Sequence, residues 1–308
     1  MTVGVALNAS DVPNQVDTTV ELAKEAAAAG ITSTWFGQSF GADSPQLAAI
    51  VGREVPGLQV GTSAIPVFGR HPLVVNSQAQ TAQAATHGRY HLGLALGAKI
   101  IAEDAFGLPF ERPIARLREF LTVLRQLTET GRADFHGELL TATTPWFPAR
   151  VPGADAGVPL LVAAMGPQAL RASGELADGI LPYLAGPRAL AEHIVPALTK
   201  AAESAGRPAP RVVAMVPGVV TDDVDAVRAT ATESFAFYEQ VPSYARVISL
   251  SGAHRAGDLA VIGDERAVAA EVQRYRDAGA TEVVFTGTEL AGEEARRRTW
   301  ALLGELAG

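Results

Sequence analysis

Leu58-Gln-Val-Gly-Thr-Ser-Ala-Ile-Pro66 opens the stretch of sequence that decides the fold, and Tyr90-His-Leu-Gly-Leu-Ala-Leu-Gly97 closes it. Between them, Pro72 opens an Ala/Gln-rich run with helical spacing that stops at Gly88. An apolar strand, a helix and a second apolar strand in this order form a βαβ crossover. Both strands are apolar on both faces, which is typical of a parallel sheet covered on each side. The stretch therefore predicts an α/β fold.

The rest of the chain repeats this alternation of strand and helix. The expected strands are 3–8, 31–37, 58–64, 90–96, 160–164, 179–183, 211–220 and 282–286. Eight such units favour a (β/α)8 TIM barrel over a doubly wound open sheet, because no Gly-rich dinucleotide turn follows the first strand. Periodicity is lost at 131–157 and 241–263, so we expect insertions after the fourth and seventh strands. Residues 1–308 are expected to form a single domain.

Composition excludes several classes of function. The chain has 308 residues, 48% hydrophobic and 19% charged, with a net charge of −8 and no basic run. The basic surface that binding to nucleic acid or an anionic membrane requires is therefore not expected. There is no cysteine, so disulfides and thiolate zinc sites are excluded. His87 and His91 stand on either side of Gly88 and so not on one helical face, and no metal-binding pair is expected. Without a leader or an apolar span, the sequence predicts a cytoplasmic enzyme.

The carboxyl ends of the strands are where a barrel of this kind holds its ligand. Small residues such as Ser63, Ala64 and Gly97 stand there, and they let the backbone approach a flat ligand closely. Ala164-Met165-Gly166-Pro167 opens a helix, whose free N–H groups favour an anion. Acids and bases are scarce at these positions. The site is therefore expected to position a small molecule.

Several motifs together resemble a known family. They are Gly61-Thr-Ser-Ala-Ile-Pro66, Arg70-His71-Pro72, Gly88-Arg-Tyr-His-Leu-Gly93, Pro159-Leu-Leu-Val-Ala-Ala-Met-Gly-Pro167 and Val261-Ile-Gly-Asp264. In order and spacing they resemble the luciferase-like monooxygenase superfamily, and within it the actinobacterial deazaflavin (coenzyme F420)-dependent oxidoreductases. The resemblance implies hydride transfer between coenzyme F420 and a small organic substrate, with reduction of a C=C or C=N bond. The alternatives are an FMN-dependent monooxygenase and a non-catalytic cofactor-binding relative.

The resemblance also implies a cofactor site. Relatives carry a non-prolyl cis peptide, which bulges against the ring, at the position of Ser63-Ala64. The helix at Gly166 would hold the phosphate, with Lys99 and Arg171 near enough to add charge. The cofactor-binding residues implied are Gln38, Ser63, Ala64, Ile65, Gly97, Lys99, Ala164, Met165, Gly166, Pro167 and Tyr183.

The proton donor is the open point of this interpretation. Gln38-Ser39 stands where many relatives carry an acid, and an amide cannot supply a proton at neutral pH. The catalytic residue is therefore unknown, with Gln38, His71 and Tyr244 as candidates, although a capping role for His71 is favoured. Residues 241–263 are expected to form a substrate-side lid, with a passive surface loop or a subunit contact in a homodimer as the alternatives.

Overall fold

The computed structural model describes residues 2–10, 12–155 and 157–308. Eight parallel strands form a closed ring, because β10 pairs with β12 on one side and with β9 on the other. The (β/α)8 barrel expected from the sequence is confirmed. In order around the barrel the strands are β1 (Thr2–Ala6), β2 (Ser33–Phe36), β3 (Gln59–Thr62), β5 (Tyr90–Ala95), β8 (Leu160–Ala163), β9 (Gly179–Ile180), β10 (Arg211–Val220) and β12 (Glu282–Thr286).

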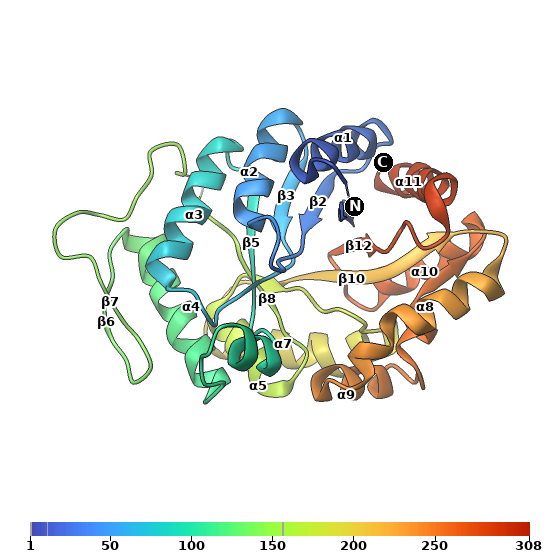
Figure 1. Ribbon diagram of the computed structural model, residues 1–308. Coiled ribbons are helices and arrows are strands. Elements are labelled where there is room, and N and C mark those ends of the chain that lie inside the picture. Colours follow the sequence, from blue (N-terminus) through green and yellow to red (C-terminus); the bar gives the residue numbers. More distant parts are fainter. Residues whose placement is uncertain (1, 11, 156) are drawn as a thin grey trace.

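Helices surround the strands (Figure 1). Their starts follow local chemistry, since the side chains of Asn14, Asp43 and Asp264 accept hydrogen bonds from the first turns of α1, α2 and α10. The helices are α1 (Gln15–Ala28), α2 (Ser44–Glu54), α3 (Pro72–Ala85), α4 (Pro113–Thr130), α5 (Pro167–Leu176), α6 (Pro187–Ala189), α7 (Val195–Ser204), α8 (Val224–Glu239), α10 (Glu265–Asp277) and α11 (Gly292–Ala307). A π-helical turn (Leu190–Ile194) joins α6 to α7. None of the described helices is both long and apolar enough to cross a membrane.

Further elements interrupt the regular alternation. After β3 the chain bends and continues as β4 (Ile65–Pro66), which also pairs with β5. A π-helical turn (Ile101–Ala105) precedes α4, and a hairpin of β6 (Asp134–His136) and β7 (Thr141–Thr143) follows it. The hairpin and the loop after it project from the barrel on the left of Figure 1.

The prediction that 241–263 is irregular is wrong. The segment forms α9 (Pro242–Leu250), a 3₁₀ turn (Ala256–Leu259) and β11 (Val261–Gly263). Pro242 stands in the first turn of α9, where a backbone N–H would have no partner within the helix. Val247 and Ile248 are the buried residues of this helix. β11 pairs in parallel with the end of β10. The segment is therefore a folded addition to the barrel rim.

Candidate active site

The turn after β3 has the geometry that the resemblance implied. The peptide bond between Ser63 and Ala64 is cis. Both residues are partly exposed, whereas Ile65 is fully buried and lies in register with Leu94 of β5, which pairs with Val162 of β8. Three neighbouring strand ends are thereby fixed in one row.

A floor of apolar side chains fills the barrel beneath this turn. Trp35 is fully buried and packs in one cluster with Leu161, Leu181, Val213, Met215 and Val284. Ala6, Ala64, Ala163 and Tyr183 pack on this cluster and stay partly exposed. Three of these four side chains are single methyl groups, so they leave room for a flat ligand. The structure thus brings two residues implied by the resemblance, Ala64 and Tyr183, to one floor.

The start of α5 is open for an anion. Gly166 is its N-cap, and no described side chain caps the free N–H groups of the first turn. A Cβ added to Gly166 would have no heavy atom of the described chain within 4 Å. Met165, Gly166 and Pro167 are partly or fully exposed, and Ala164 is buried. Backbone N–H groups and the helix dipole together favour a phosphate here.

The basic residues expected near this helix start have other partners. Lys99 is an exposed side chain 3.7 Å from the Glu103 carboxylate, and Arg171 donates to Glu175 at 2.8 Å. Gly97, two residues before Lys99, has φ of 81°, a backbone conformation that favours glycine. Any contribution of Lys99 or Arg171 to cofactor binding stays a prediction.

Gln38 and His71 organise loops at the same end of the barrel. The Gln38 amide donates to Ser39 O at 2.7 Å and accepts from Ser44 N–H at 3.0 Å, which orders the turn before α2. His71 caps α3, since its Nδ1 accepts from Leu73 N–H at 3.3 Å while Nε2 donates to Thr141 O at 3.0 Å. Both ring nitrogens of His71 are thus engaged, which favours the capping role over a catalytic one.

Three tyrosines from separate elements meet beside the floor. The Tyr183 ring, after β9, lies 5.2 Å from the Tyr238 ring of α8 and 6.1 Å from the Tyr244 ring of α9. Tyr238 and Tyr244 are 4.9 Å apart, centroid to centroid. Burial raises the pKa of all three hydroxyls, so they stay protonated at neutral pH. Sequence reasoning named Tyr183 and Tyr244 but missed Tyr238, whose helix carries no motif.

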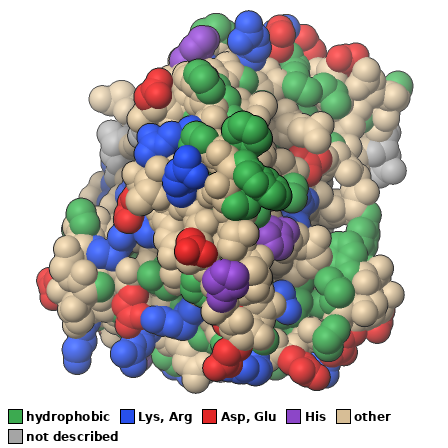
Figure 2. Space-filling view, turned by 90° about the vertical axis from the view of Figure 1, so that its left-hand side faces the viewer, with side chains coloured by type: hydrophobic (Ala, Val, Ile, Leu, Met, Phe, Trp, Pro, Cys, Tyr) green, Lys and Arg blue, Asp and Glu red, His purple; other side chains and the backbone are tan. Residues whose placement is uncertain are grey.

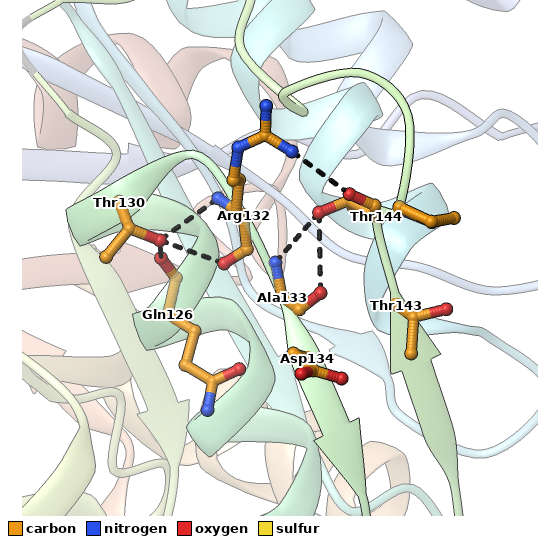
Figure 3. A pocket seen from close by; sticks show the side chains of 8 residues that line it. Gln126, Thr130, Arg132, Ala133, Asp134, Thr143 and Thr144 are labelled. Atoms are coloured by element: carbon orange, nitrogen blue, oxygen red, sulfur yellow. Dashed lines mark hydrogen bonds between the residues drawn. The ribbon is translucent and has the colours of Figure 1, made fainter.

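A separate cavity of about 630 Å³ lies outside the barrel, between α4 and the β6–β7 hairpin. Figure 3 shows Gln126 and Thr130 on its α4 side and Asp134 and Thr143 on the hairpin side. Its polar groups largely bond to one another, as where Arg132 Nη1 donates to Thr144 O at 3.3 Å. Among the described residues, none that the resemblance implies lines this cavity.

The face that carries this hairpin also exposes aromatic side chains. Figure 2 shows hydrophobic side chains near the middle of this face, among charged groups. Trp146 and Phe147, in the loop after β7, are 81% and 80% exposed. The homodimer expected from the sequence stays a prediction.

The fold agrees with the comparison to known families. A family model described as luciferase-like monooxygenase matches residues 1–282. The chain belongs to this family. The family and the kind of enzyme expected from the sequence, a luciferase-like oxidoreductase, are therefore confirmed.

Individual relatives differ in cofactor and reaction. The phthiodiolone/phenolphthiodiolone dimycocerosates ketoreductase of Mycobacterium bovis is 29% identical over 248 residues, which cover 75% of this chain and 64% of that protein. Among solved structures, the coenzyme F420-dependent tetrahydromethanopterin reductase of Methanopyrus kandleri matches with a TM-score of 0.78 at 23% identity, covering 99% of this chain and 97% of that one. A type II Baeyer-Villiger monooxygenase of Pseudomonas putida, in complex with FMN, also matches with a TM-score of 0.78, at 15% identity, covering 100% and 98%. At these identities the structural matches show the fold alone.

Proposed function

We propose that this protein is a coenzyme F420-dependent oxidoreductase that transfers a hydride between the deazaflavin and a small organic substrate. The observation that supports it is the floor of Ala6, Ala64 and Ala163 beside the Ser63–Ala64 turn. Small side chains on two strands and in the turn after a third offer a planar ring a contact surface that larger residues would fill. The uncapped start of α5 adds a fitting place for a phosphate.

The residues of the chain would act by positioning. When bound, the deazaflavin supplies or accepts the hydride. Ser63 and Ala64 would support one face of the ring, and the N–H groups after Gly166 would hold its phosphate. Trp35 and Met215 would close the barrel beneath it, because both are buried in the floor cluster. The opposite face of the ring would be left for the substrate.

The bond that is reduced stays a proposal. The sequence predicted a C=C or C=N bond, and the name of the ketoreductase relative adds C=O as a third possibility. A second candidate function is an FMN-dependent monooxygenase, favoured by the match to a structure that holds FMN. The absence of an acid at Gln38 keeps a non-catalytic cofactor-binding protein as the third.

Cofactor titration of the purified protein tests these candidates. We expect coenzyme F420 to change its absorption and fluorescence on binding, and FMN to bind more weakly. Gly166→Asp would place a carboxylate at the phosphate and should raise the Kd about fivefold or more, since unfavourable charge contacts cost about 1–3 kcal/mol.

Gly166→Ala is the matched control, because the space around Gly166 is open and a methyl group there removes no N–H donor. Its Kd should stay within about twofold, a change of only about 0.4 kcal/mol. An unchanged Kd in Gly166→Asp would refute the phosphate site. Binding of FMN alone would replace the proposed function by the monooxygenase, and binding of neither cofactor would refute both.

A further inference from the structure

The three tyrosines form a continuous wall at one side of the strand ends. Tyr183 packs on the floor cluster inside the barrel and, together with Tyr238 and Tyr244, on a second buried cluster. All three side chains are partly exposed. The wall is therefore anchored in two cores and still reaches the surface of the site.

Its place in the barrel puts it opposite the cis peptide. Tyr183 follows β9 and its backbone bridges to Met215 of β10, whereas Ala64 follows β3. Three steps around an eight-stranded ring separate β3 from β9, so the two lie nearly across the barrel from each other. A ring supported by Ser63 and Ala64, as in the proposed function on which this inference rests, would turn its other face toward the tyrosines.

The wall offers hydroxyl groups and aromatic surface. The ring contacts of its members are with one another and with Phe235 and Phe237. Glu239, the carboxylate next in the chain to Tyr238, accepts hydrogen bonds from Arg255 at 2.9 Å and from Ala256 N–H at 3.0 Å. Its charge is thereby held by groups outside the wall.

A neighbouring strand end adds one more hydroxyl. Thr286 ends β12, one strand beyond β10, and its buried Oγ1 lies beside the Tyr183 hydroxyl. Two neighbouring hydroxyls can pass a hydrogen bond on to a ligand, because each can donate and accept. Hydroxyl donors beside aromatic rings suit a neutral ligand with one acceptor atom, because rings stack on conjugated systems and hydroxyls bind a carbonyl.

We propose that Tyr183, Tyr238 and Tyr244 form the substrate-binding wall, and that it takes an uncharged, conjugated carbonyl compound whose oxygen accepts a hydrogen bond from a tyrosine hydroxyl. A carboxylate of the same shape is disfavoured, since the ring neighbours of the three tyrosines are uncharged. The cation–π contacts of the described residues, Arg116 on Phe68 and Arg296 on Trp300, involve other rings.

Fluorine NMR of the full chain labelled with 3-fluorotyrosine tests this directly. The chain has five tyrosines, and Tyr90 and Tyr275 are buried in the core at 0% and 2% exposure, so they serve as internal controls. The probe is 4-phenylbut-3-en-2-one, a neutral conjugated ketone, and cinnamate is its charged counterpart. Each resonance is assigned with a single Tyr→Phe variant. We expect the ketone to shift the resonances of residues 183, 238 and 244, to leave the other two in place, and to bind at least tenfold more tightly than cinnamate.

Two variants test the hydroxyl at the same time. Tyr183→Phe keeps the ring and removes the donor, so it should raise the Kd of the ketone about fivefold, as expected for one hydrogen bond. Tyr275→Phe should leave that Kd unchanged. Equal shifts at all five tyrosines, no binding of the ketone, or equal binding of ketone and cinnamate would overturn the proposal.

The titration is run with and without coenzyme F420, which separates this inference from the proposed function. If the coenzyme fails to bind while the ketone still shifts the three wall resonances, the proposed function fails and the wall stands. If the coenzyme binds and the ketone shifts none of them, the wall fails alone.

Discussion

Gly61 shows how one residue fixes the floor of the site. Trp35 fills the centre of the barrel, and a Cβ added at Gly61 would lie 2.4 Å from Cζ3 of its ring. Gly61→Ala should therefore displace Trp35 and lower the free energy of unfolding by about 1–3 kcal/mol, the usual cost of overpacking a core. Gly41→Ala is the control, because its nearest neighbour is the end of the Gln15 side chain at 3.5 Å. Chemical denaturation of both variants measures the difference, and equal stability would show that the floor can adjust.

At the same scale, sequence reasoning located some site residues and missed others for a physical reason. Ser63 and Ala64 belong to one short motif, so a resemblance could place them together. Tyr183 and Tyr238 are 55 positions apart on two elements, and only the closed barrel brings their rings to 5.2 Å. Local sequence carries no record of such a contact. The hydrogen bonds of Gln38 to Ser39 and Ser44 in its own loop could likewise not be predicted from the sequence.

Helix α9 is the element whose observed structure differs most from the prediction. Its inner face buries only Val247 and Ile248, and its far end is held where Ser251 Oγ accepts from Gly186 N–H at 2.9 Å. A short helix with so small a buried face opens more readily than the barrel strands. We retain the lid interpretation in this form: α9 closes when the substrate site is filled.

Hydrogen exchange followed by mass spectrometry tests the lid. Exchange in residues 242–252 should slow when both coenzyme F420 and 4-phenylbut-3-en-2-one are present, and should change little with the coenzyme alone, because the substrate side is what the lid covers. The strand β10 serves as the reference within the same sample. Slowing by the coenzyme alone would assign α9 to the cofactor pocket, and no slowing in either case would end the lid interpretation.

Regular elements were predictable and short irregular ones were not. The strands at 211–220 and 282–286 were predicted with the bounds that the structure has, since runs of buried Val and Phe admit few alternatives. The nine residues of α9 are fewer than the roughly 11–18 over which a helical period is recognised, and β6 and β7 have three residues each. These pieces form because the finished barrel gives them a surface to pack on.

At the scale of the whole molecule, a buried polar network joins five strands at the amino-terminal end of the barrel. Glu282 of β12 is 2% exposed. Its carboxylate accepts hydrogen bonds from Arg211 of β10 at 2.9 Å and from Ser33 of β2 at 2.5 Å. His91 of β5 lies 3.2 Å from Arg211 and 3.1 Å from the Gln59 amide oxygen of β3. Polar groups at this end of a barrel serve stability rather than catalysis.

Acid should weaken the barrel through His91. Arg211 donates to Nδ1, so the neutral ring donates from Nε2 to Gln59, and Arg211 and Glu282 are the charged groups that face this site. Burial, and then the charge of Arg211, lower the pKa of His91 to about 3. Because the unfolded pKa is about 6.5, this stabilisation is complete at higher pH and is lost as pH falls from 6.5 toward 3.

The resulting loss between pH 8 and pH 5 should be about 2 kcal/mol in the free energy of unfolding. His91→Gln removes the titrating group and keeps an amide able to bond to Gln59, so its stability should fall by less over the same range. His136→Gln, at the exposed end of β6, should follow the wild type, because this side chain is exposed and lies outside the buried network. Urea unfolding of the three proteins at both pH values decides the matter. If wild type and His91→Gln lose equal stability, His91 is protonated in the folded barrel without penalty, and the acid sensitivity comes from carboxylates instead.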